Sequence, residues 1–442
     1  MSQTTMPRHL PWLIWTVGAG VYFLAFIHRA SLGVAGPDAT SRLDISATQL
    51  GSFILVQLGL YAFMQVPAGL AIDRWGARRV LLASTVAMGC AQVMFGFATS
   101  YPLALIARGL LGVGDAAVFI AVLRLAATYF PRRRYAFLTM LTALAGMVGN
   151  LVATVPLVIA LDTWGWSHTF IASGLASIVY AVLLVRPAVR PAPDAPEELT
   201  PARGPRARGV WARPEVRLGF WTHLATLHPA LVLSLLWGFP YLTQGLDYSD
   251  QAAASMLSLY IGVNVVSSFV VGPLAGRKPR WRMAIGVGVA SGLTLSLAGL
   301  VLWPGGNPPA WYVAFTFGIA AVGVPTSQIG FHLARDYSPH GSISTATGVV
   351  NAGGFVAAII TSVVIGAVLD GLGGPSLPHF RWALACFAGI SSIATLIVLI
   401  STLGVRNQVF HRMAHGDRVV VPVQIRLWDR AYSRLRGKPL PG

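Results

Sequence analysis

The sequence predicts an all-α membrane protein with twelve transmembrane helices in two pseudo-symmetric halves of six. Three observations carry this prediction. The 442 residues are 55% hydrophobic and only 11% charged, whereas soluble domains carry about 25% charged residues. The apolar residues gather in twelve long segments, and short motifs in the first half recur in degenerate form in the second. Most of the chain is therefore expected to contact lipid and not water.

The twelve apolar segments define the expected spans. Each is close to the roughly 20 residues that a helix needs to cross about 30 Å of hydrocarbon. The first segment is long and further spans follow it, so we expect a retained helix and not a cleaved signal peptide. The expected spans are 10–34, 48–71, 80–98, 102–129, 135–161 and 168–185 in the first half, and 218–242, 252–275, 283–302, 311–333, 344–369 and 380–403 in the second.

Two polar stretches complete the expected organisation. Residues 187–216 are rich in Pro, Ala and Arg, a composition that cannot bury a core, and they are expected to link the halves 1–186 and 217–404 on the cytoplasmic side. Residues 405–442 are basic with scattered apolar residues. We expect a solvated, partly disordered cytoplasmic tail there, with an interfacial segment on anionic lipid as the alternative.

The charge pattern indicates a membrane orientation and excludes several classes of function. The net charge is +17, but the basic residues fall between apolar segments and not on a nucleic-acid-binding module. Cys90 and Cys386 lie in apolar stretches and are expected to be packing residues. No catalytic triad, metal cluster or phosphate-binding loop is recognisable, so we expect no enzyme activity, cofactor or metal. Basic residues of the short loops fall on one side, which predicts a multi-pass protein of the plasma or inner membrane with both termini cytoplasmic.

An internal repeat supports the two halves. Residues 129–132 (Tyr-Phe-Pro-Arg) lead into a fifth span with Gly146 and Gly149, and residues 336–339 (Asp-Tyr-Ser-Pro) lead into a glycine-bearing eleventh span. The loop Gly69-Leu-Ala-Ile-Asp73-Arg-Trp-Gly76-Ala-Arg78-Arg79 likewise has a degenerate partner in residues 272–277. Repeated halves are typical of secondary transporters.

The loop that begins at Gly69 resembles the signature loop of the major facilitator superfamily, and the resemblance implies that it gates. Gly69 would let two helices approach closely, and Asp73 would sit at the N-terminus of a helix from the other half. The arginine pair would bind lipid phosphate or Asp73; an ordinary charged turn is the alternative. Arg124 points away from Arg108 on the same span, and we assign it to a cytoplasmic latch formed with this loop. The expected gating residues are Gly69, Asp73, Arg74, Gly76, Arg78, Arg79 and Arg124.

Within that superfamily the sequence resembles the anion:cation symporters, which include carriers of sugar acids, sialic acid and glutamate. In span one, Phe26-Ile27-His28-Arg29-Ala30-Ser31-Leu32 is similar to that family's Asp-Arg pair and small-residue run. In span four, residues 108–116 (Arg-Gly-Leu-Leu-Gly-Val-Gly-Asp-Ala) match its arrangement of an acid seven residues after an Arg. His28 stands where that family has its Asp, so the resemblance does not by itself identify the residue that couples the proton.

Arg29 and Arg108 are the strongest candidates for substrate binding. A charged side chain inside a bilayer costs at least about 2.5 kcal/mol, so each should face a polar cavity or a partner. Arg29 precedes Pro37 by eight residues and Arg108 follows Tyr101 by seven, which places both roughly 10 Å below the outer boundary. Two guanidinium groups at one depth can bind a carboxylate or phosphate. The alternative is that each arginine snorkels or pairs with a carboxylate for structural reasons.

The remaining candidates surround these arginines. Asp115 lies two turns after Arg108 on the same helix face, and we expect it to carry a proton through the cycle; a permanent ion pair with Arg108 or another base is the alternative. His28 is a second proton-coupling and substrate-binding candidate. Tyr22 lies on the face of Arg29 and can bind substrate or pack as an aromatic residue. The second half contributes further substrate-binding candidates, for which a packing role is the alternative: His228, Gln328 and Asn351.

These residues lead to one leading hypothesis and two rivals. The first is proton-coupled symport of a small organic anion, a carboxylate or sugar acid, by rocking of the two halves. The second is proton-coupled export of lipophilic or cationic compounds, and the third is a receptor or scaffold that transports nothing. Two arginines against one aspartate favour the anion. The expected partners are an anionic small molecule, protons and membrane lipids, without nucleic acid, and the expected oligomeric state is a monomer.

Overall fold

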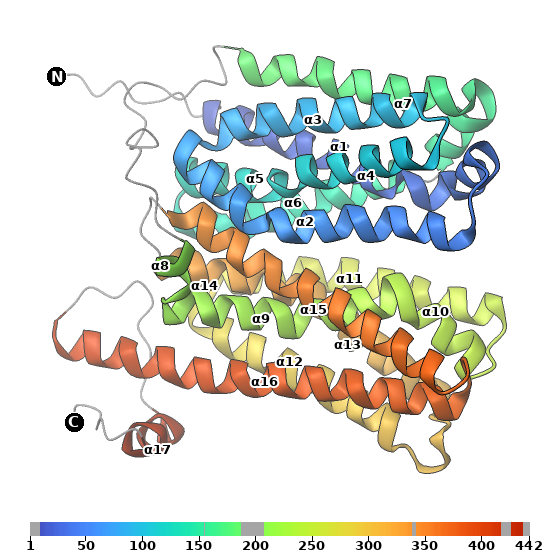
Figure 1. The fold of residues 1–442 in the computed structure, drawn as a ribbon. Coiled ribbons are helices and arrows are strands. Elements are labelled where there is room, and N and C mark those ends of the chain that lie inside the picture. The colour runs from blue at the N-terminus through green and yellow to red at the C-terminus, as the bar shows by residue number, and fades with distance from the viewer. Residues whose placement is uncertain (1–8, 154, 187–206, 338–341, 417–425, 436–442) are drawn as a thin grey trace, which may run out of the picture. The chain divides into compact units, whose positions relative to one another are not determined.

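The computed structural model describes residues 9–153, 155–186, 207–337, 342–416 and 426–435. These residues are almost entirely helical and contain no strand, and they include twelve helical segments long and apolar enough to cross a membrane (Figure 1). The chain divides into two compact units, 1–207 with 339–348 and 208–338 with 349–442. The expected fold class is thereby confirmed.

The first unit contains the first six spans. Its fourth span consists of two helices that meet end to end. The helices are α1 (Leu10–Leu43), α2 (Ala47–Trp75), α3 (Ala77–Phe97), α4 (Tyr101–Ala116), α5 (Val118–Tyr129), α6 (Arg132–Val152) and α7 (Val155–Val185).

The second unit repeats this plan, with a seventh span interrupted by two π-helical segments, Val232–Trp237 and Tyr241–Gly245, and with 3₁₀ turns at Pro279–Trp281 and Pro304–Gly306. The helices are α8 (Ala207–Trp211), α9 (Pro214–Leu231), α10 (Gly238–Pro240), α11 (Asp250–Arg277), α12 (Arg282–Leu302), α13 (Ala310–Ser327), α14 (Ile329–Tyr337), α15 (Ile343–Gly371), α16 (Leu377–Ala414) and α17 (Leu427–Leu435).

Packing within the units reproduces the repeat. In the first unit α2 packs on α4 and α3 on α7; in the second, α11 packs on α13 and α12 on α16. Span four breaks at Ala117 and span ten at Gln328. Glycines allow these broken spans to pack closely. A Cβ at Gly112 would overlap the carbonyl oxygen of Gln57, and one at Gly323 would overlap that of Thr226. Small residues at helix interfaces replace the hydrophobic driving force that lipid cannot supply.

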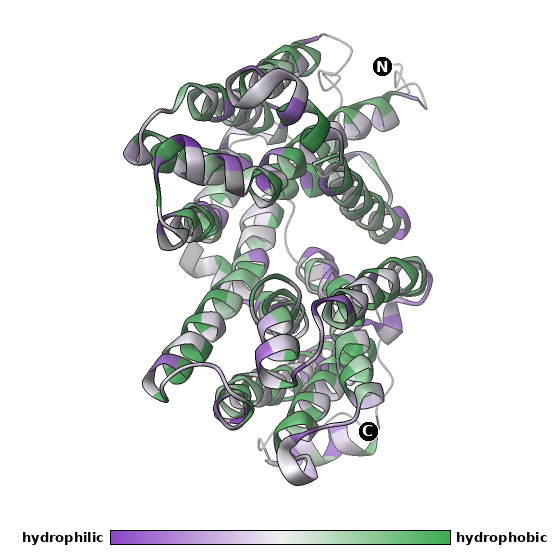
Figure 2. Ribbon diagram, turned by 90° about the vertical axis from the view of Figure 1, so that its right-hand side faces the viewer, coloured by the Kyte–Doolittle hydropathy of each residue, from purple (hydrophilic) through white to green (hydrophobic). Residues whose placement is uncertain are grey.

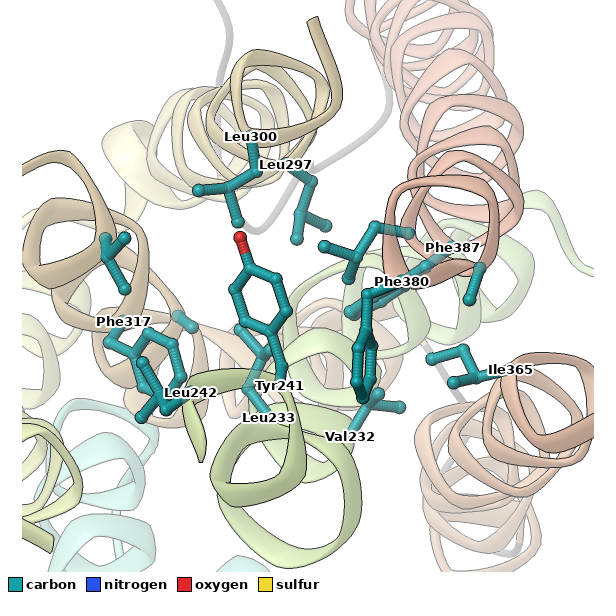
Figure 3. Packing of buried hydrophobic residues seen from close by; sticks show 14 of the residues in the cluster. Val232, Leu233, Tyr241, Leu242, Leu297, Leu300, Phe317, Ile365, Phe380 and Phe387 are labelled. Atoms are coloured by element: carbon teal, nitrogen blue, oxygen red, sulfur yellow. The ribbon is translucent and has the colours of Figure 1, made fainter. Parts of the chain in front are cut away.

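Aromatic residues pack with aliphatic ones in a core cluster of the second unit. Tyr241 of the seventh span lies among Leu297 of α12, Phe317 of α13 and Phe380 of α16 (Figure 3). The rings of Tyr241 and Phe380 are 5.6 Å apart in an edge-to-face arrangement, which aromatic pairs prefer. This cluster holds the irregular seventh span in place.

Apolar side chains also cover the outer surfaces of the spans. Phe63, Leu302 and Trp382 are largely exposed, and colouring by hydropathy shows helices that are apolar over most of their length (Figure 2). Cys90 and Cys386 are exposed on this surface as well, so the expectation that they are packing residues is wrong. A periodicity argument does not distinguish a lipid-facing cysteine from a buried one, because both lie in apolar surroundings.

The structure places a turn between the fifth and sixth spans at Gly165, whose φ is 69°. Helix α6 ends at Val152, and the first part of α7 runs from Val155 up to this turn. The Thr169 hydroxyl donates to the Ala160 carbonyl oxygen at 2.9 Å, so the chain reverses between these two residues. The spans expected over 135–161 and 168–185 therefore lie on either side of the turn.

The C-terminal region is more ordered than expected. Helix α16 continues to Ala414, and α17 packs beside it (Figure 1). Residues 417–425 and 436–442 of the expected tail lie outside the described residues, as do residues 187–206 of the expected linker. The remainder of that linker contains α8 and the first turn of α9.

Candidate functional site

The break in span four follows directly after Asp115, which is buried within the first unit. Helix α4 ends at Ala116, and the side-chain amide of Gln65 donates to the Ala116 carbonyl oxygen at 3.3 Å. Gly114 allows α4 to approach α3, since a Cβ there would lie 3.2 Å from the carbonyl oxygen of Ser84. A helix end leaves backbone carbonyls that need partners, and a glutamine from α2 supplies one here.

Asp115 forms an ion pair with Arg29 of α1. Its Oδ2 accepts from Arg29 Nε at 2.8 Å and lies 2.7 Å from an Arg29 terminal nitrogen. The Asp115 side chain is 1% exposed and that of Arg29 is 16% exposed. Oδ1 of Asp115 has no hydrogen-bond partner in the described structure. The guanidinium of Arg29 also lies over the rings of Phe26 and Tyr61, 4.4 and 4.7 Å from their centroids. Arg29 therefore has a carboxylate partner, and that partner comes from another span.

Arg108 is buried without such a partner. It is 1% exposed, and its terminal nitrogens reach the carbonyl oxygens of His28 and Arg29 and the hydroxyl of Ser31 only at 3.4–3.5 Å. Its Nε has no acceptor, and within the described ranges no carboxylate oxygen forms an ion pair with it. A buried charge without a counter-charge is unfavourable, so this position would be stabilised by an anion.

His28 is held away from the ion pair. Its Nε2 lies 2.6 Å from the Ser177 hydroxyl, and its Nδ1 lies 3.0 Å from the side-chain nitrogen of Gln92 and 3.2 Å from the Ser173 hydroxyl. The ring is fully buried among α1, α3 and α7. Neither the proton-coupling nor the binding role of His28 is tested by this geometry. Ser173 and Ser177 were not predicted from the sequence, although their spacing of four places both on one helix face.

Tyr22 lies near the ion pair. It packs against Phe26 and Phe119, with ring centroids 5.0 and 5.3 Å away, and it is close enough to Arg29 to interact electrostatically, as is Tyr61. Aromatic packing, one of the two alternatives for Tyr22, is present, and a contact with substrate stays a prediction. Tyr61 of α2 was missed because nothing in the sequence distinguishes it from other interfacial or packing tyrosines.

Two of the candidates from the second unit gather at the break in span ten. Gln328 separates α13 from α14, and its buried Oε1 has no partner in the described structure. Asn351 is buried near His223, whose Nδ1 lies 3.1 Å from the Ser327 carbonyl oxygen. His223 was not predicted from the sequence, where a second histidine in the seventh span is the signal that points to it.

His228 is held by its own span and by α16. Its Nδ1 lies 2.7 Å from the Leu224 carbonyl oxygen and its Nε2 lies 3.3 Å from the Ser391 hydroxyl. Both ring nitrogens are thus in hydrogen bonds, with Nδ1 as the donor to the carbonyl.

A second cluster surrounds Asp73 and is called the Asp73 latch here. The carboxylate accepts from the backbone nitrogens of Ser344 and Thr345 at 3.1 and 2.7 Å and from the Thr345 hydroxyl at 2.6 Å. These residues form the first turn of α15, and this turn lies in the segment 339–348 that groups with the first unit. Asp73 is therefore at a helix N-terminus, as expected. A Cβ at Gly69 would lie 2.6 Å from the Ser344 carbonyl oxygen, which confirms the close approach.

The arginines near the latch separate into two groups. Arg124 lies 4.0 Å from Asp73, whereas Arg78 donates to the Leu184 carbonyl oxygen at 2.6 Å and Arg79 is exposed. Arg74 is exposed, with its guanidinium 5.8 Å from the ring of Trp75. Gly76 makes the turn between α2 and α3 with a φ of 84°, which glycine adopts without strain. Within the described residues, no ion pair joins Arg78 or Arg79 to Asp73. The arginine that pairs with Asp73 is Arg124.

The sequence and the fold both match known proteins. Residues 18–360 match the sequence profile of the Major Facilitator Superfamily. The chain is 23% identical over 424 residues to the probable sulfoacetate transporter SauU of Cupriavidus necator, covering 90% of this chain and 95% of that protein. It is 23% identical over 434 residues to the probable galactarate/D-glucarate transporter GarP of Escherichia coli, with the same shares of 90% and 95%. The proton:xylose symporter XylE has the same fold, with a TM-score of 0.67 at 15% identity over 89% of this chain and 96% of that chain.

The profile match covers most of the chain, the twelve spans and the Asp73 latch agree with it, and the similar proteins are transporters. The chain therefore belongs to the Major Facilitator Superfamily and is a multi-pass membrane transporter.

Proposed function

We propose that this transporter carries a small organic anion together with a proton by alternating access. The observation that carries the proposal is the arrangement of charges in the first unit. Arg29 is paired with Asp115, and Arg108 is buried without a carboxylate partner among the described residues. Two cations against one carboxylate leave one positive charge uncompensated, which favours an anionic substrate.

The Arg29–Asp115 pair provides a physical route for coupling. When Asp115 takes up a proton, its attraction for Arg29 weakens, and the guanidinium becomes available to a substrate carboxylate, which it binds bidentately. When Asp115 is ionised, it competes with the substrate for Arg29. Binding of a proton and binding of an anion therefore favour each other, and this linkage is reciprocal. Symport requires such a coupling.

The similar proteins are consistent with this substrate class. Sulfoacetate and galactarate, which appear in the names of two of them, are small organic anions. Export of a lipophilic cation, the alternative function, would need an accessible carboxylate without a counter-charge. Asp115 does not provide one, because Arg29 neutralises it.

The proposed location is the plasma or inner membrane with both termini cytoplasmic. Basic loop residues such as Arg79, Arg133 and Lys278 fall on one side of the expected spans, and positively charged short loops stay in the cytoplasm. This orientation places the Asp73 latch at the cytoplasmic ends of the spans.

Transport measurements on Arg29 variants test the proposal. Purified protein in proteoliposomes with an inward proton gradient should accumulate radiolabelled galactarate, glucarate or sulfoacetate. Arg29→Lys keeps a charge beside Asp115 but loses the planar guanidinium, which can bind a carboxylate through two hydrogen bonds. The free energy of substrate binding should therefore weaken by roughly 1.5–3 kcal/mol. Arg29→Ala should eliminate binding, measured as ligand-induced thermal stabilisation.

Arg42→Ala is the matched control for these variants. Arg42 lies further along α1 and donates to the Ala98 carbonyl oxygen and the Ser167 hydroxyl, so its loss should leave substrate affinity unchanged. Near-normal anion transport by Arg29→Ala would refute the anion symporter and leave the exporter as the better hypothesis.

A further inference from the structure

Helix α17 is fastened to α16 by a buried ion pair. Arg406 donates to Asp429 from Nε at 2.7 Å and from a terminal nitrogen at 2.6 Å, and the Asp429 side chain is 1% exposed. The backbone nitrogen of Arg426 also donates to Asp429 at 2.9 Å. An isolated helix of nine residues is only marginally stable in water. The Arg406–Asp429 ion pair, called the clamp here, therefore fixes both the position of α17 and the face that it turns outward.

The clamp lies where α16 leaves the apolar layer. No charged residue occurs in α16 between Arg381 and Arg406, a stretch that spans about 37 Å at 1.5 Å per residue. This is about the thickness of the hydrocarbon core plus part of the headgroup region. Arg406 therefore marks the boundary of the layer, and α17, which is bound to it, lies at the depth of lipid headgroups.

The outward face of α17 combines apolar and basic residues. Leu427 and Trp428 are 83% and 51% exposed. The guanidinium of Arg426 lies over the Trp428 ring, 5.0 Å from its centroid, and Arg430 and Arg434 are exposed. Asp429 is buried on the other face and paired with Arg406, so the charged residues described on the outward face are all basic.

We propose that α17 is an interfacial anchor that binds the surface of an anionic phospholipid bilayer. Trp428 and Leu427 enter the headgroup layer, where tryptophan is favoured, and the three arginines bind lipid phosphates. A second copy of the chain fits this face less well, since a stable protein interface buries more than about 1,000 Å² and nine residues offer far less. The proposal does not depend on the substrate or on proton coupling.

Hydrogen–deuterium exchange of the full-length protein tests this anchor. The protein is placed in nanodiscs of phosphatidylcholine alone or of phosphatidylcholine with phosphatidylglycerol, and the exchange of the α17 amides is compared between them. The expected result is slower exchange with the anionic lipid. Replacing Arg430→Gln and Arg434→Gln together should reduce this lipid-dependent protection, by roughly fivefold for each arginine.

Two further variants separate the clamp from the lipid contact. Leu427→Ser together with Trp428→Ser keeps Arg406 and Asp429 and should lose only the protection by lipid. Exchanging the charges of the clamp with Arg406→Asp and Asp429→Arg should retain protection, whereas Arg406→Ala alone should lose it in both lipids. Equal exchange of α17 in both lipids would overturn the proposal. So would protection that rises with the number of copies per disc, which would indicate a contact between copies.

Discussion

Arg29 and Arg108 have the same chemistry and the same expected depth, but the structure surrounds them differently. Arg29 is paired with Asp115, and its guanidinium lies over the rings of Phe26 and Tyr61. Within the described part of the chain, Arg108 makes only long contacts to backbone and hydroxyl oxygens and lies 5.1 Å from the ring of Phe95. One arginine thus has an internal counter-ion that competes with substrate, and the other retains an uncompensated charge. This difference predicts opposite responses to substitution.

The first residue-scale prediction concerns the coupled proton. Asp115→Asn cannot ionise, so it should abolish accumulation driven by a pH gradient yet preserve exchange of substrate between equally loaded compartments. Its substrate affinity should hardly change with pH, whereas that of the unmodified protein should fall as pH rises and the carboxylate competes for Arg29. Uptake and counterflow in proteoliposomes measure both. Loss of both activities in a well-expressed variant would instead indicate a structural ion pair.

The second residue-scale prediction compares the two arginines. Arg108→Met removes a buried charge without exposing a counter-ion, so it should stabilise the ligand-free protein by on the order of 2 kcal/mol. Arg29→Ala leaves Asp115 without a partner and should cost about 3–5 kcal/mol, and adding Asp115→Asn should recover most of that loss. Thermal unfolding in detergent measures these changes. Destabilisation by Arg108→Met would mean that Arg108 is needed for packing.

At the scale of single helices, the breaks in spans four and ten determine which groups lie deep in each unit. Helix α4 ends beside Asp115, and the Gln65 amide binds the carbonyl oxygen at that end. In span ten, Gln328 occupies the break, next to the Ser327 carbonyl oxygen that His223 contacts. The breaks thus bring polar groups to corresponding places in the two repeated units.

Helix packing at these breaks leads to a stability prediction. A Cβ at Gly112 would overlap the backbone of Gln57, which cannot rotate away, so Gly112→Ala should force α4 from α2 and cost about 1–3 kcal/mol. Gly59→Ala on α2 is the control, because a Cβ there meets nothing within 4 Å, and alanine in a helix is favoured over glycine by roughly 0.5–1 kcal/mol. Equal melting temperatures for the two variants would contradict the close packing.

At the scale of the whole molecule, twelve spans form two units of related design, and the Asp73 latch is the contact through which the proposed alternation can be tested. Asp73→Asn keeps a hydrogen-bond acceptor but removes the negative charge, whose interaction with a helix N-terminus contributes about 0.3–1 kcal/mol. The variant should fold and insert normally while shifting the balance between inward-open and outward-open states. Accessibility to a membrane-impermeant thiol probe, with cysteines introduced at the ends of the spans, measures the shift.

Asp44→Asn is the control for the latch. Asp44 has a φ of 50° at the end of α1, a conformation that asparagine tolerates, and it takes no part in the Asp73 latch. If Asp73→Asn and Asp44→Asn gave the same labelling as the unmodified protein, the latch would have no role in the conformational balance.

The sequence by itself determined the twelve spans, the repeat and the helix-terminus role of Asp73. A helix needs about 20 apolar residues to span the lipid bilayer, and a charged signature loop between two spans can be recognised from the sequence alone. The tertiary structure decided the rest. It assigned Asp115 to Arg29, 86 residues away, gave Arg108 no carboxylate partner among the described residues, and bound α17 to α16 through Arg406 and Asp429. Hydropathy and motif spacing describe each residue within its own segment, whereas a charged group's partner depends on which helix faces meet, and that is set by packing.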